Sequence, residues 1–396
     1  MSETGSRPST RVRIESVDLV RGIIMILMAL DHVRDFFGSL AVSPTNLATT
    51  TVPLFATRWI THICAPVFFL LMGTGSYLAS CRRSRRELSR HLLTRGLWLI
   101  LVEFVVVRFA LQFNVDYQLT VLTVLWALGW AMIVLSALVF LPTGVVTAIG
   151  VVMIAAHNLL DPIPATALGT FAPLWLVLHQ PGVIFSSSQH TVFAAYPLVP
   201  WIGMAAAGYG LGAIYQWDAG RRKAFLLRLG MGLTAAFLVL RFLNVYGDPV
   251  AWKTQTTPVF TALAFLNTNK YPPSLLYLLM TLGPALLLLR AFDDRTPAIL
   301  RPALIIGKVP FFYYVVHLAL IHLLAVVASY ARYRDVHWMF ESPTLDRFPI
   351  TQPPGWPAGL PVIYLIWAGV VLALYPLCRW YATLRERRTD AWLSYL

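Results

Sequence analysis

The sequence predicts an all-α integral membrane protein, a polytopic bundle of about ten transmembrane helices with both termini in the cytoplasm. Of its 396 residues, 58% are hydrophobic and only 12% are charged. The apolar residues come in blocks of about 20, the length that an α-helix needs to cross roughly 30 Å of hydrocarbon. The expected spans are 16–38, 55–80, 91–113, 119–141, 144–160, 192–215, 224–245, 272–292, 303–329 and 359–381. An even number of spans places both termini on the same side of the membrane.

Arginine and lysine gather in alternate connections, and this asymmetry predicts which side is cytoplasmic, because short cytoplasmic loops retain positive charge. The basic residues of this face are Arg7, Arg11, Arg13, Arg82, Arg83, Arg85, Arg86, Arg90, Arg221, Arg222, Lys223, Arg385, Arg387 and Arg388. Connections 38–54 and 161–191, on the opposite face, contain no lysine or arginine. The net charge of +13 is therefore explained by membrane topology and contact with anionic lipid headgroups, and no nucleic-acid partner is expected.

The chain divides into one membrane domain and two short tails. Residues 1–15 are polar and are expected to form a disordered cytoplasmic tail, and 383–396 a cytoplasmic C-terminal tail. The transmembrane domain covers 16–382. Glycines within the second and sixth spans, at 73–75 and 208–212, predict close approach of neighbouring helices.

Cysteines and histidines show no metal-binding motif. The three cysteines, Cys64, Cys81 and Cys378, are far apart in the chain and are expected to fill apolar space. No HxxxH or HExxH pair is present, so we predict no metal. The histidines expected on the outer surface are His157, His179 and His190.

Four titratable residues crowd the outer end of the first span, where Asp31, His32, Arg34 and Asp35 follow one another. A charged side chain at the centre of a bilayer costs about 2.5–3.5 kcal/mol on insertion scales, so such groups usually face a protein interior or a wet cavity. Helical spacing places Asp18, Arg21, Met25, Met28, His32 and Asp35 on one stripe. That stripe predicts a passage from the cytosol towards the outer leaflet.

Two further spans bring titratable groups to the same level. Arg58 and His62, at the start of the second span, share one helix face and lie level with the Asp31–Asp35 segment. The ninth span adds Lys308 near the cytosol, with His317 and His322 deeper towards the outside. The first alternative is that these groups only hold helices together, and the second is a proton-coupled transporter.

Several segments resemble one family of membrane enzymes, the heparan-α-glucosaminide N-acetyltransferases, which include a lysosomal enzyme and many bacterial relatives. The most specific segment is Arg13-Ile14-Glu15-Ser16-Val17-Asp18-Leu19-Val20-Arg21-Gly22, similar to the first-helix signature of the family. Weaker similarities lie at 65–73, 196–203 and 307–317. The resemblance implies an acetyl-CoA-dependent acyltransferase that passes an acetyl group from the cytosol to an acceptor on the far side of the membrane.

The resemblance is not uniform at the reaction centre. His32 matches the position of a functional asparagine in the lysosomal enzyme. The proposed catalytic histidine of that enzyme follows the first helix, whereas residues 38–57 here contain no histidine. The Asp31–Asp35 cluster with Arg58 and His62 instead suits a bacterial subgroup in the inner membrane.

We therefore expect the following roles. His32 is the base, Asp31 or Asp35 orients it, and the catalytic group includes His62. The expected substrate-binding residues are Arg34, Arg58, His317 and His322, and those for the CoA phosphates are Arg21, Lys308, Arg82 and Arg83. The acceptor is a hydroxyl or amine of an extracytoplasmic, sugar-containing molecule bound under loops 161–191 and 330–358. Membrane lipids are expected partners. The sequence does not decide between a monomer and a homodimer.

Overall fold

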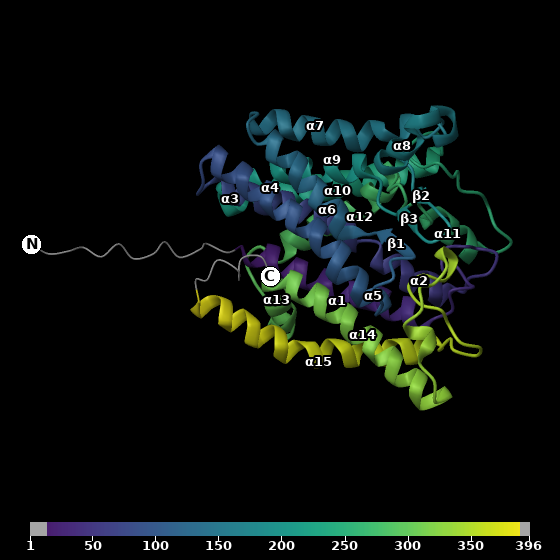
Figure 1. Cartoon of the computed structure of the whole chain (residues 1–396). Coiled ribbons are helices and arrows are strands. Elements are labelled where there is room, and N and C mark those ends of the chain that lie inside the picture. Colours follow the sequence, from purple (N-terminus) through teal and green to yellow (C-terminus); the bar gives the residue numbers. More distant parts are fainter. Residues whose placement is uncertain (1–13, 389–396) are drawn as a thin grey trace, which may run out of the picture.

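The computed structural model describes residues 14–388, which form a bundle of roughly parallel and antiparallel helices (Figure 1). Residues 1–13 and 389–396, and with them most of both predicted tails, lie outside the described part. The helices are α1 Glu15–Phe37, α2 Val52–Thr61, α3 Cys64–Ser80, α4 Arg85–Val102, α5 Arg108–Gln112, α6 Val124–Leu138, α7 Thr143–Ala156, α8 Ala172–Leu178, α9 Leu198–Gly212, α10 Ala219–Leu243, α11 Pro258–Leu266, α12 Leu275–Ala291, α13 Arg301–Lys308, α14 Pro310–Tyr333 and α15 Leu360–Arg387. A π-helical turn, Glu103–Val107, joins α4 to α5, and the short 3₁₀ turns are His157–Leu160, Ala165–Phe171, Ala213–Gln216, Ala298–Leu300, His337–Met339 and Leu345–Arg347.

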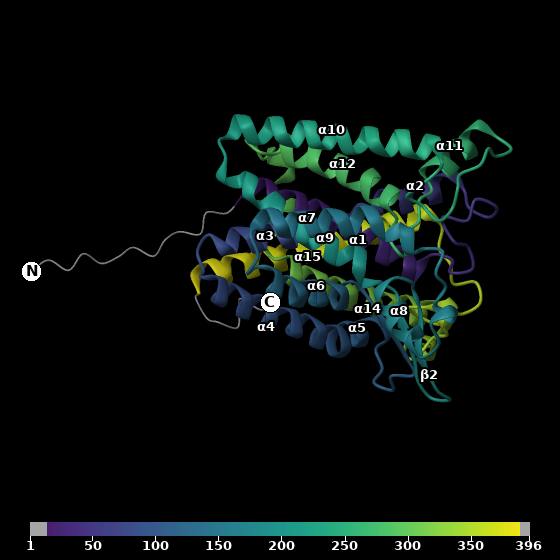
Figure 2. The ribbon, with the colours of Figure 1, turned by 90° about the horizontal axis from the view of Figure 1, so that it is seen from above.

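Within residues 14–388, six helical segments are long and apolar enough to cross a membrane. They are Val52–Ser80, Thr143–Leu160, Leu198–Gln216, Ala219–Leu243, Pro310–Tyr333 and Leu360–Arg387. The protein is an integral membrane protein, while the count of about ten spans and the cytoplasmic side of the termini stay predictions. Figures 1 and 2 place the start of α1 and the end of α15 at the same end of the bundle.

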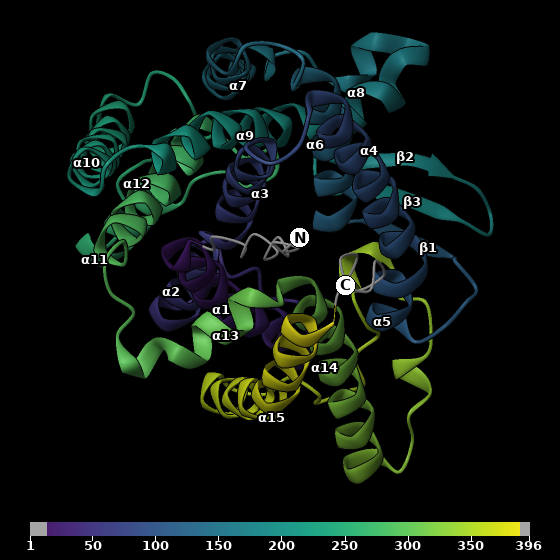
Figure 3. The same ribbon diagram turned by 90° about the vertical axis from the view of Figure 1, so that its left-hand side faces the viewer.

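The helices differ in how much of their surface other helices cover. Seen along the bundle, α7, α10 and α15 lie at the periphery, whereas α1, α3, α4, α6 and α14 surround its centre (Figure 3). Of the apolar stretch of α9, 78% of residues are buried, against 17% for α15. Because lipid is as apolar as a protein core, α15 can expose its apolar residues and still be stable in a bilayer.

The fold is mostly helical, as predicted, but three short strands, which the sequence did not predict, lie at the end of the bundle opposite the start of α1 (Figure 1). β1 (Leu119–Leu122) pairs parallel with β3 (Thr191–Ala194), which pairs antiparallel with β2 (Gly182–Ser186). The predicted spans 119–141 and 192–215 therefore begin too early, since their first residues are strands. A short apolar run fits a helix or a strand equally well by periodicity, and only the pairing partner decides between them.

Proline breaks the second predicted span. Pro66 cannot donate to the carbonyl of His62, and its ring clashes with that carbonyl, so 55–80 divides into α2 and α3. The freed carbonyl is not left unpaired, because the Tyr277 hydroxyl donates to it at 2.6 Å. This break directs α2 outward along the chamber described below.

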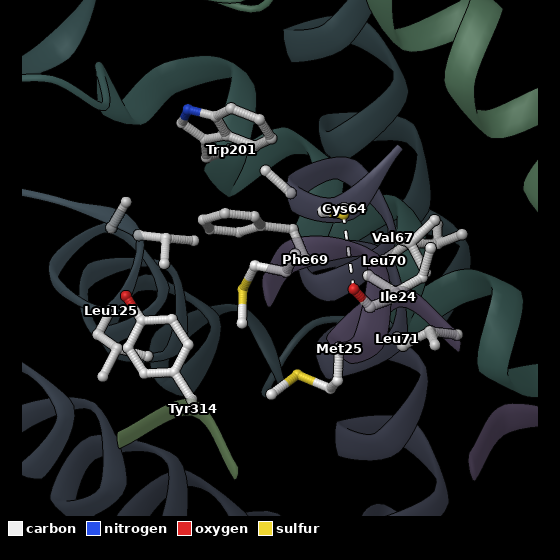
Figure 4. Close-up of a cluster of buried hydrophobic side chains, with 14 of the residues drawn as sticks. Ile24, Met25, Cys64, Val67, Phe69, Leu70, Leu71, Leu125, Trp201 and Tyr314 are labelled. Atoms are coloured by element: carbon white, nitrogen blue, oxygen red, sulfur yellow. Dashed lines mark hydrogen bonds between the residues drawn. The ribbon is translucent and has the colours of Figure 1, made fainter. Parts of the chain in front are cut away.

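Three glycines allow two close helix contacts, one of which, between α3 and α9, the sequence predicted. A Cβ added to Gly73 of α3 would lie 2.0 Å from the carbonyl oxygen of Ala205 in α9, and one added to Gly208 would lie 2.2 Å from that of Leu70. Gly22 of α1 approaches α13 in the same way. Figure 4 shows the core that this packing builds, with Phe69 stacked on Trp201 at 4.7 Å between ring centres.

A buried arginine organises the connection between α10 and α12. The Arg241 guanidinium donates to four carbonyl oxygens, those of Val250, Ala264, Phe265 and Asn267, at 2.7–3.1 Å. This contact fixes the loop that carries two residues of the chamber.

We expect Arg241→Met to lower stability strongly, because it strands buried carbonyl oxygens and leaves Asp248, 3.8 Å away, without its cation. Removing one partner of a buried ion pair typically costs about 3–5 kcal/mol. The measurement is the melting temperature of the detergent-purified protein. The control is Arg228→Met on the exposed face of the same helix, which should change stability by less than about 0.5 kcal/mol. Equal melting temperatures for the two variants would contradict this role of Arg241.

Candidate active site

An ion-pair network lies in the C-terminal half of α1. Arg34 donates through Nη2 to Asp31 Oδ1 at 3.0 Å and to Asp35 Oδ1 at 2.6 Å. Arg58 of α2 pairs with the other oxygen of Asp31. The predicted contact between the first two helical segments is therefore present, and both carboxylates accept from guanidinium groups.

His32 lies at the edge of this network. Its Nδ1 is 3.9 Å from Asp35 Oδ2, the carboxylate oxygen that does not accept from Arg34. Its ring lies 5.2 Å from that of His317 of α14, between centroids. Asp35 therefore presents one carboxylate oxygen towards the His32 ring, beyond hydrogen-bond distance.

These side chains open into a cavity of about 440 Å³, here called the chamber. Its polar wall is formed by Asp31, His32, Arg34, Asp35, Arg58, Lys270 and Tyr271. Its remaining wall includes Pro181 and Phe193 of the β2–β3 region, Tyr314 of α14, and Leu345, Phe348 and Pro349. The two outer loops expected to cover the acceptor, 161–191 and 330–358, both contribute to this wall.

Sequence reasoning missed Lys270 and Tyr271, because they lie in an irregular loop to which helical periodicity does not apply. Asp248 holds this loop, accepting from the Asn269 backbone N–H at 2.9 Å and from the Ser274 hydroxyl at 2.7 Å. Burial raises the pKa of Tyr271, but the charges of Lys270 and Arg58 outweigh burial and bring that pKa below its ordinary value. The Tyr271 hydroxyl lies 3.5 Å from that of Tyr196, which also lines the chamber.

A second cavity, of about 320 Å³, continues from the chamber towards the other end of the bundle. We call it the channel; it shares Phe68, Val124 and Tyr314 with the chamber. Apolar side chains such as Met25, Leu71 and Leu125 form most of its wall. The predicted stripe of α1 is thus confirmed as a lining: Arg21 and Met25 face the channel, and Met28, His32 and Asp35 face the chamber.

Cationic groups surround the far end of the channel. A cavity of about 420 Å³, here called the mouth, is lined by Gly75, Ala79, Arg82, Arg83, His91, Arg95 and Arg385. The mouth and the channel share Gly75, Ala79, His91 and Arg95, so the two adjoin. The predicted pair Arg82 and Arg83 lies here. His91, Arg95 and Arg385 were missed, because they belong to α4 and α15, and only packing brings these helices together.

Three histidines predicted for the site lie beside or away from the chamber. His62 faces a side cavity of about 410 Å³ that shares Arg34, Arg58, Lys270 and Tyr271 with the chamber. His317 donates from Nδ1 to the Tyr313 carbonyl at 3.0 Å, behind His32. In contrast, His322 is held between the carbonyl oxygens of Ala110 and Met339, at 3.0 and 2.8 Å, and stacks on Phe113. These contacts give His322 a structural place and not a substrate-binding one.

Two other expectations differ from the structure. Lys308 was expected at the CoA site, but its Nζ pairs with Glu386 Oε1 at 3.1 Å, and it lies on α13 outside the mouth and channel. His157 and His179 were expected on the outer surface, yet they are 2% and 0% exposed. Only His190 of the three is exposed. The loop after α7 folds back on the bundle, which charge and hydropathy did not reveal.

This arrangement defines a class of protein, an integral membrane protein in which a basic mouth leads through an apolar channel to a chamber of paired acids, arginines and histidine. A sequence profile for the catalytic region of heparan-alpha-glucosaminide N-acetyltransferase matches residues 13–246, more than half of the chain. The chain therefore belongs to the heparan-alpha-glucosaminide N-acetyltransferase family of membrane acetyltransferases. No curated protein matches it. The matched region contains α1 to α10, and so most of the mouth and chamber.

Proposed function

We propose that this protein transfers an acetyl group from cytosolic acetyl-CoA to a hydroxyl or amine of a sugar-containing acceptor on the extracytoplasmic side of a bacterial inner membrane. One observation supports this most strongly: mouth, channel and chamber adjoin in a line, and their linings change from cationic to apolar to acid–base. That order matches the order of chemical groups along acetyl-CoA, whose phosphates, pantetheine arm and thioester follow one another.

The mouth suits the phosphate end of the donor. Arginine side chains bind phosphate oxygens in bidentate geometry, and Arg82, Arg83, Arg95 and Arg385 surround one cavity. Arg21 lies further in, held by Asp18 at 2.9 Å and by the Gly307 carbonyl at 3.3 Å. Arg21 and His32 are 11 residues apart on one helix, which corresponds to about 16 Å along its axis. An extended thiol arm entering beside Arg21 therefore reaches towards His32.

In the chamber, His32 acts as general base. It accepts the proton of the acceptor hydroxyl or amine as the new C–O or C–N bond forms at the acetyl carbonyl carbon. Arg58, Lys270 and Tyr271 face the same cavity and can stabilise the oxyanion of the tetrahedral intermediate. The C–S bond then breaks, and protonated His32 returns the proton to the CoA thiolate. Asp35 stabilises the imidazolium in between.

The transporter alternative makes a different prediction for the same cavities. A proton-coupled carrier needs titratable groups near the middle of the membrane, whereas the network lies in the outer half of α1 and both of its carboxylates are paired with arginine.

The deciding experiment is calorimetric binding of acetyl-CoA to the detergent-purified protein, followed by thiol release from acetyl-CoA with a panel of hydroxyl and amino sugars. Saturable binding with sugar-dependent thiol release supports the acetyltransferase. A folded protein that binds neither acetyl-CoA nor CoA would favour the transporter.

We expect Arg95→Gln to weaken acetyl-CoA binding roughly tenfold, about 1.4 kcal/mol, because Arg95 lines both the mouth and the channel. The affinity for S-acetylpantetheine, which lacks the nucleotide phosphates, should change much less. Arg221→Gln is the matched control, since Arg221 is exposed and stacks on Trp217 outside the mouth. Equal losses for both ligands would show that Arg95 does not bind phosphate.

A further inference from the structure

A buried cluster on the outer side of the bundle is not used by the proposed reaction. His157 begins the turn after α7, Asp161 follows it, and His179 ends α8. One ligand atom from each of the three side chains lies within 4.8 Å of the other two. Among residues 14–388 this is the one such group of histidine, cysteine and acidic residues close enough to hold a metal ion.

The histidines of this cluster carry buried nitrogen atoms that the described chain leaves poorly satisfied. His157 is 2% exposed; the Pro273 backbone lies near its ring, but neither ring nitrogen makes a well-formed hydrogen bond to residues 14–388. His179 is fully buried, and its Nδ1 also lacks a partner among those residues. A buried polar atom without a partner destabilises the folded protein. The two histidine rings lie 5.9 Å apart between their centres, and a metal ion between them would accept their free lone pairs.

The geometry points to a transition-metal site, and we propose that His157, Asp161 and His179 bind one Zn²⁺ ion. Two imidazole nitrogens and one carboxylate oxygen are a common zinc donor set, and water completes the tetrahedron. His179 Nε2 already lies 3.0 Å from Asp161 Oδ1, close to the separation of two ligands on one zinc ion. A small movement of the His157 ring brings the third ligand to a metal–nitrogen distance of about 2.0–2.1 Å.

The surroundings orient the proposed ligands. Asn158 donates through Nδ2 to Asp161 Oδ2 at 2.8 Å, which leaves Oδ1 facing His179. The Trp175 ring packs against the His179 ring at 5.1 Å. Such outer contacts fix the direction of metal ligands in known sites. The Asp161 side chain is 19% exposed, so an ion and a water molecule can reach the site from outside.

The position of the site suggests a structural role. The ion ties the outer end of α7 to the end of α8, and His179 lies two residues before Pro181, which lines the chamber. Asn158 also accepts from the Leu275 backbone N–H at 2.9 Å, which connects the same turn to α12. Zinc would therefore hold the outer loop in place over the chamber. This inference does not depend on the proposed acetyl transfer.

The test is zinc binding by the full chain, purified in detergent without a polyhistidine tag and stripped with a chelator. A Cys81→Ser background removes an exposed thiol that could bind the ion. We expect one Zn²⁺ per chain by calorimetry and elemental analysis, and a higher melting temperature with Zn²⁺. His157→Gln and His179→Gln should lose both effects, whereas His190→Gln, in an exposed position of the same outer region, should keep them.

A second measurement keeps the proposal testable if the variants fail to fold. X-ray absorption at the zinc edge of the otherwise unaltered protein should show two imidazole ligands with oxygen ligands. The absence of stoichiometric Zn²⁺ binding, binding undiminished in His157→Gln, or a spectrum without two imidazoles would each overturn the proposal.

Discussion

Replacing His32 by glutamine should lower the rate of acetyl transfer by a factor of about 10²–10⁴, the usual contribution of a general base. Glutamine fills a similar volume and can hydrogen-bond, but it cannot take a proton from the attacking group. His32 lines the chamber and not the mouth or channel, so the affinity for acetyl-CoA should stay close to that of the unaltered protein. The measurement is thiol release from acetyl-CoA in the presence of an acceptor, with binding measured separately by calorimetry.

Two companion variants show whether His32 acts as a base or only as a structural group. Asp35→Asn should lower the rate less than His32→Gln, because Asp35 acts through His32. It should also move the pH profile of the rate to lower pH, because the imidazolium of His32 loses its proton more readily without the carboxylate charge beside it. His322→Gln is the control for a histidine with a structural role. It should lower the melting temperature, because His322 bridges two buried carbonyl oxygens. A rate for His32→Gln close to that of the unaltered protein would remove His32 from the mechanism.

Replacing Gly75 by leucine should weaken acetyl-CoA binding strongly without unfolding the protein. Gly75 lines both the mouth and the channel, and a Cβ added there meets no atom within 4 Å. A leucine side chain therefore enters open space and obstructs the passage that the thiol arm needs. The effect should be a loss of affinity of at least about tenfold, or 1.4 kcal/mol, measured by calorimetry.

The same helix supplies a contrasting variant. Gly73→Leu forces a side chain against the α9 backbone, 2.0 Å from the Ala205 carbonyl oxygen, and should lower the melting temperature sharply. Gly232→Leu on the exposed face of α10 is the matched control, because its Cβ also meets nothing within 4 Å and lies outside the passage. Both Gly75 and Gly232 gain the same helix propensity on substitution. Acetyl-CoA binding by Gly75→Leu as strong as that of Gly232→Leu would show that the donor enters elsewhere.

Within a single helix, the sequence was sufficient to predict which residues line the cavities. The 3.6-residue period placed Arg21, Met25, Met28, His32 and Asp35 on one face of α1, and that face lines the channel and chamber. The charge of the Asp31–Asp35 segment identified the chamber, because charged groups inside a membrane protein need a polar or wet partner. The short connection to α2 then made the Arg58–Asp31 contact predictable.

The sequence was not sufficient to predict which residues of different helices and loops line the same cavity. His91 and Arg95 come from α4 and Arg385 from α15, and no spacing in the chain relates these helices. Lys270 and Tyr271 depend on a loop whose shape is set by Arg241 and Asp248.

The sequence by itself determined the membrane class, the family and the polar face of α1, because composition, motifs and helical periodicity are local properties. The tertiary structure alone decided that residues 119–122 are a strand, that Lys308 pairs with Glu386, and that His157 and His179 are buried together. Each of these outcomes depends on which distant segment packs against the residue. Such packing is a property of the whole fold, since the free energy of burying or pairing a group depends on its partner.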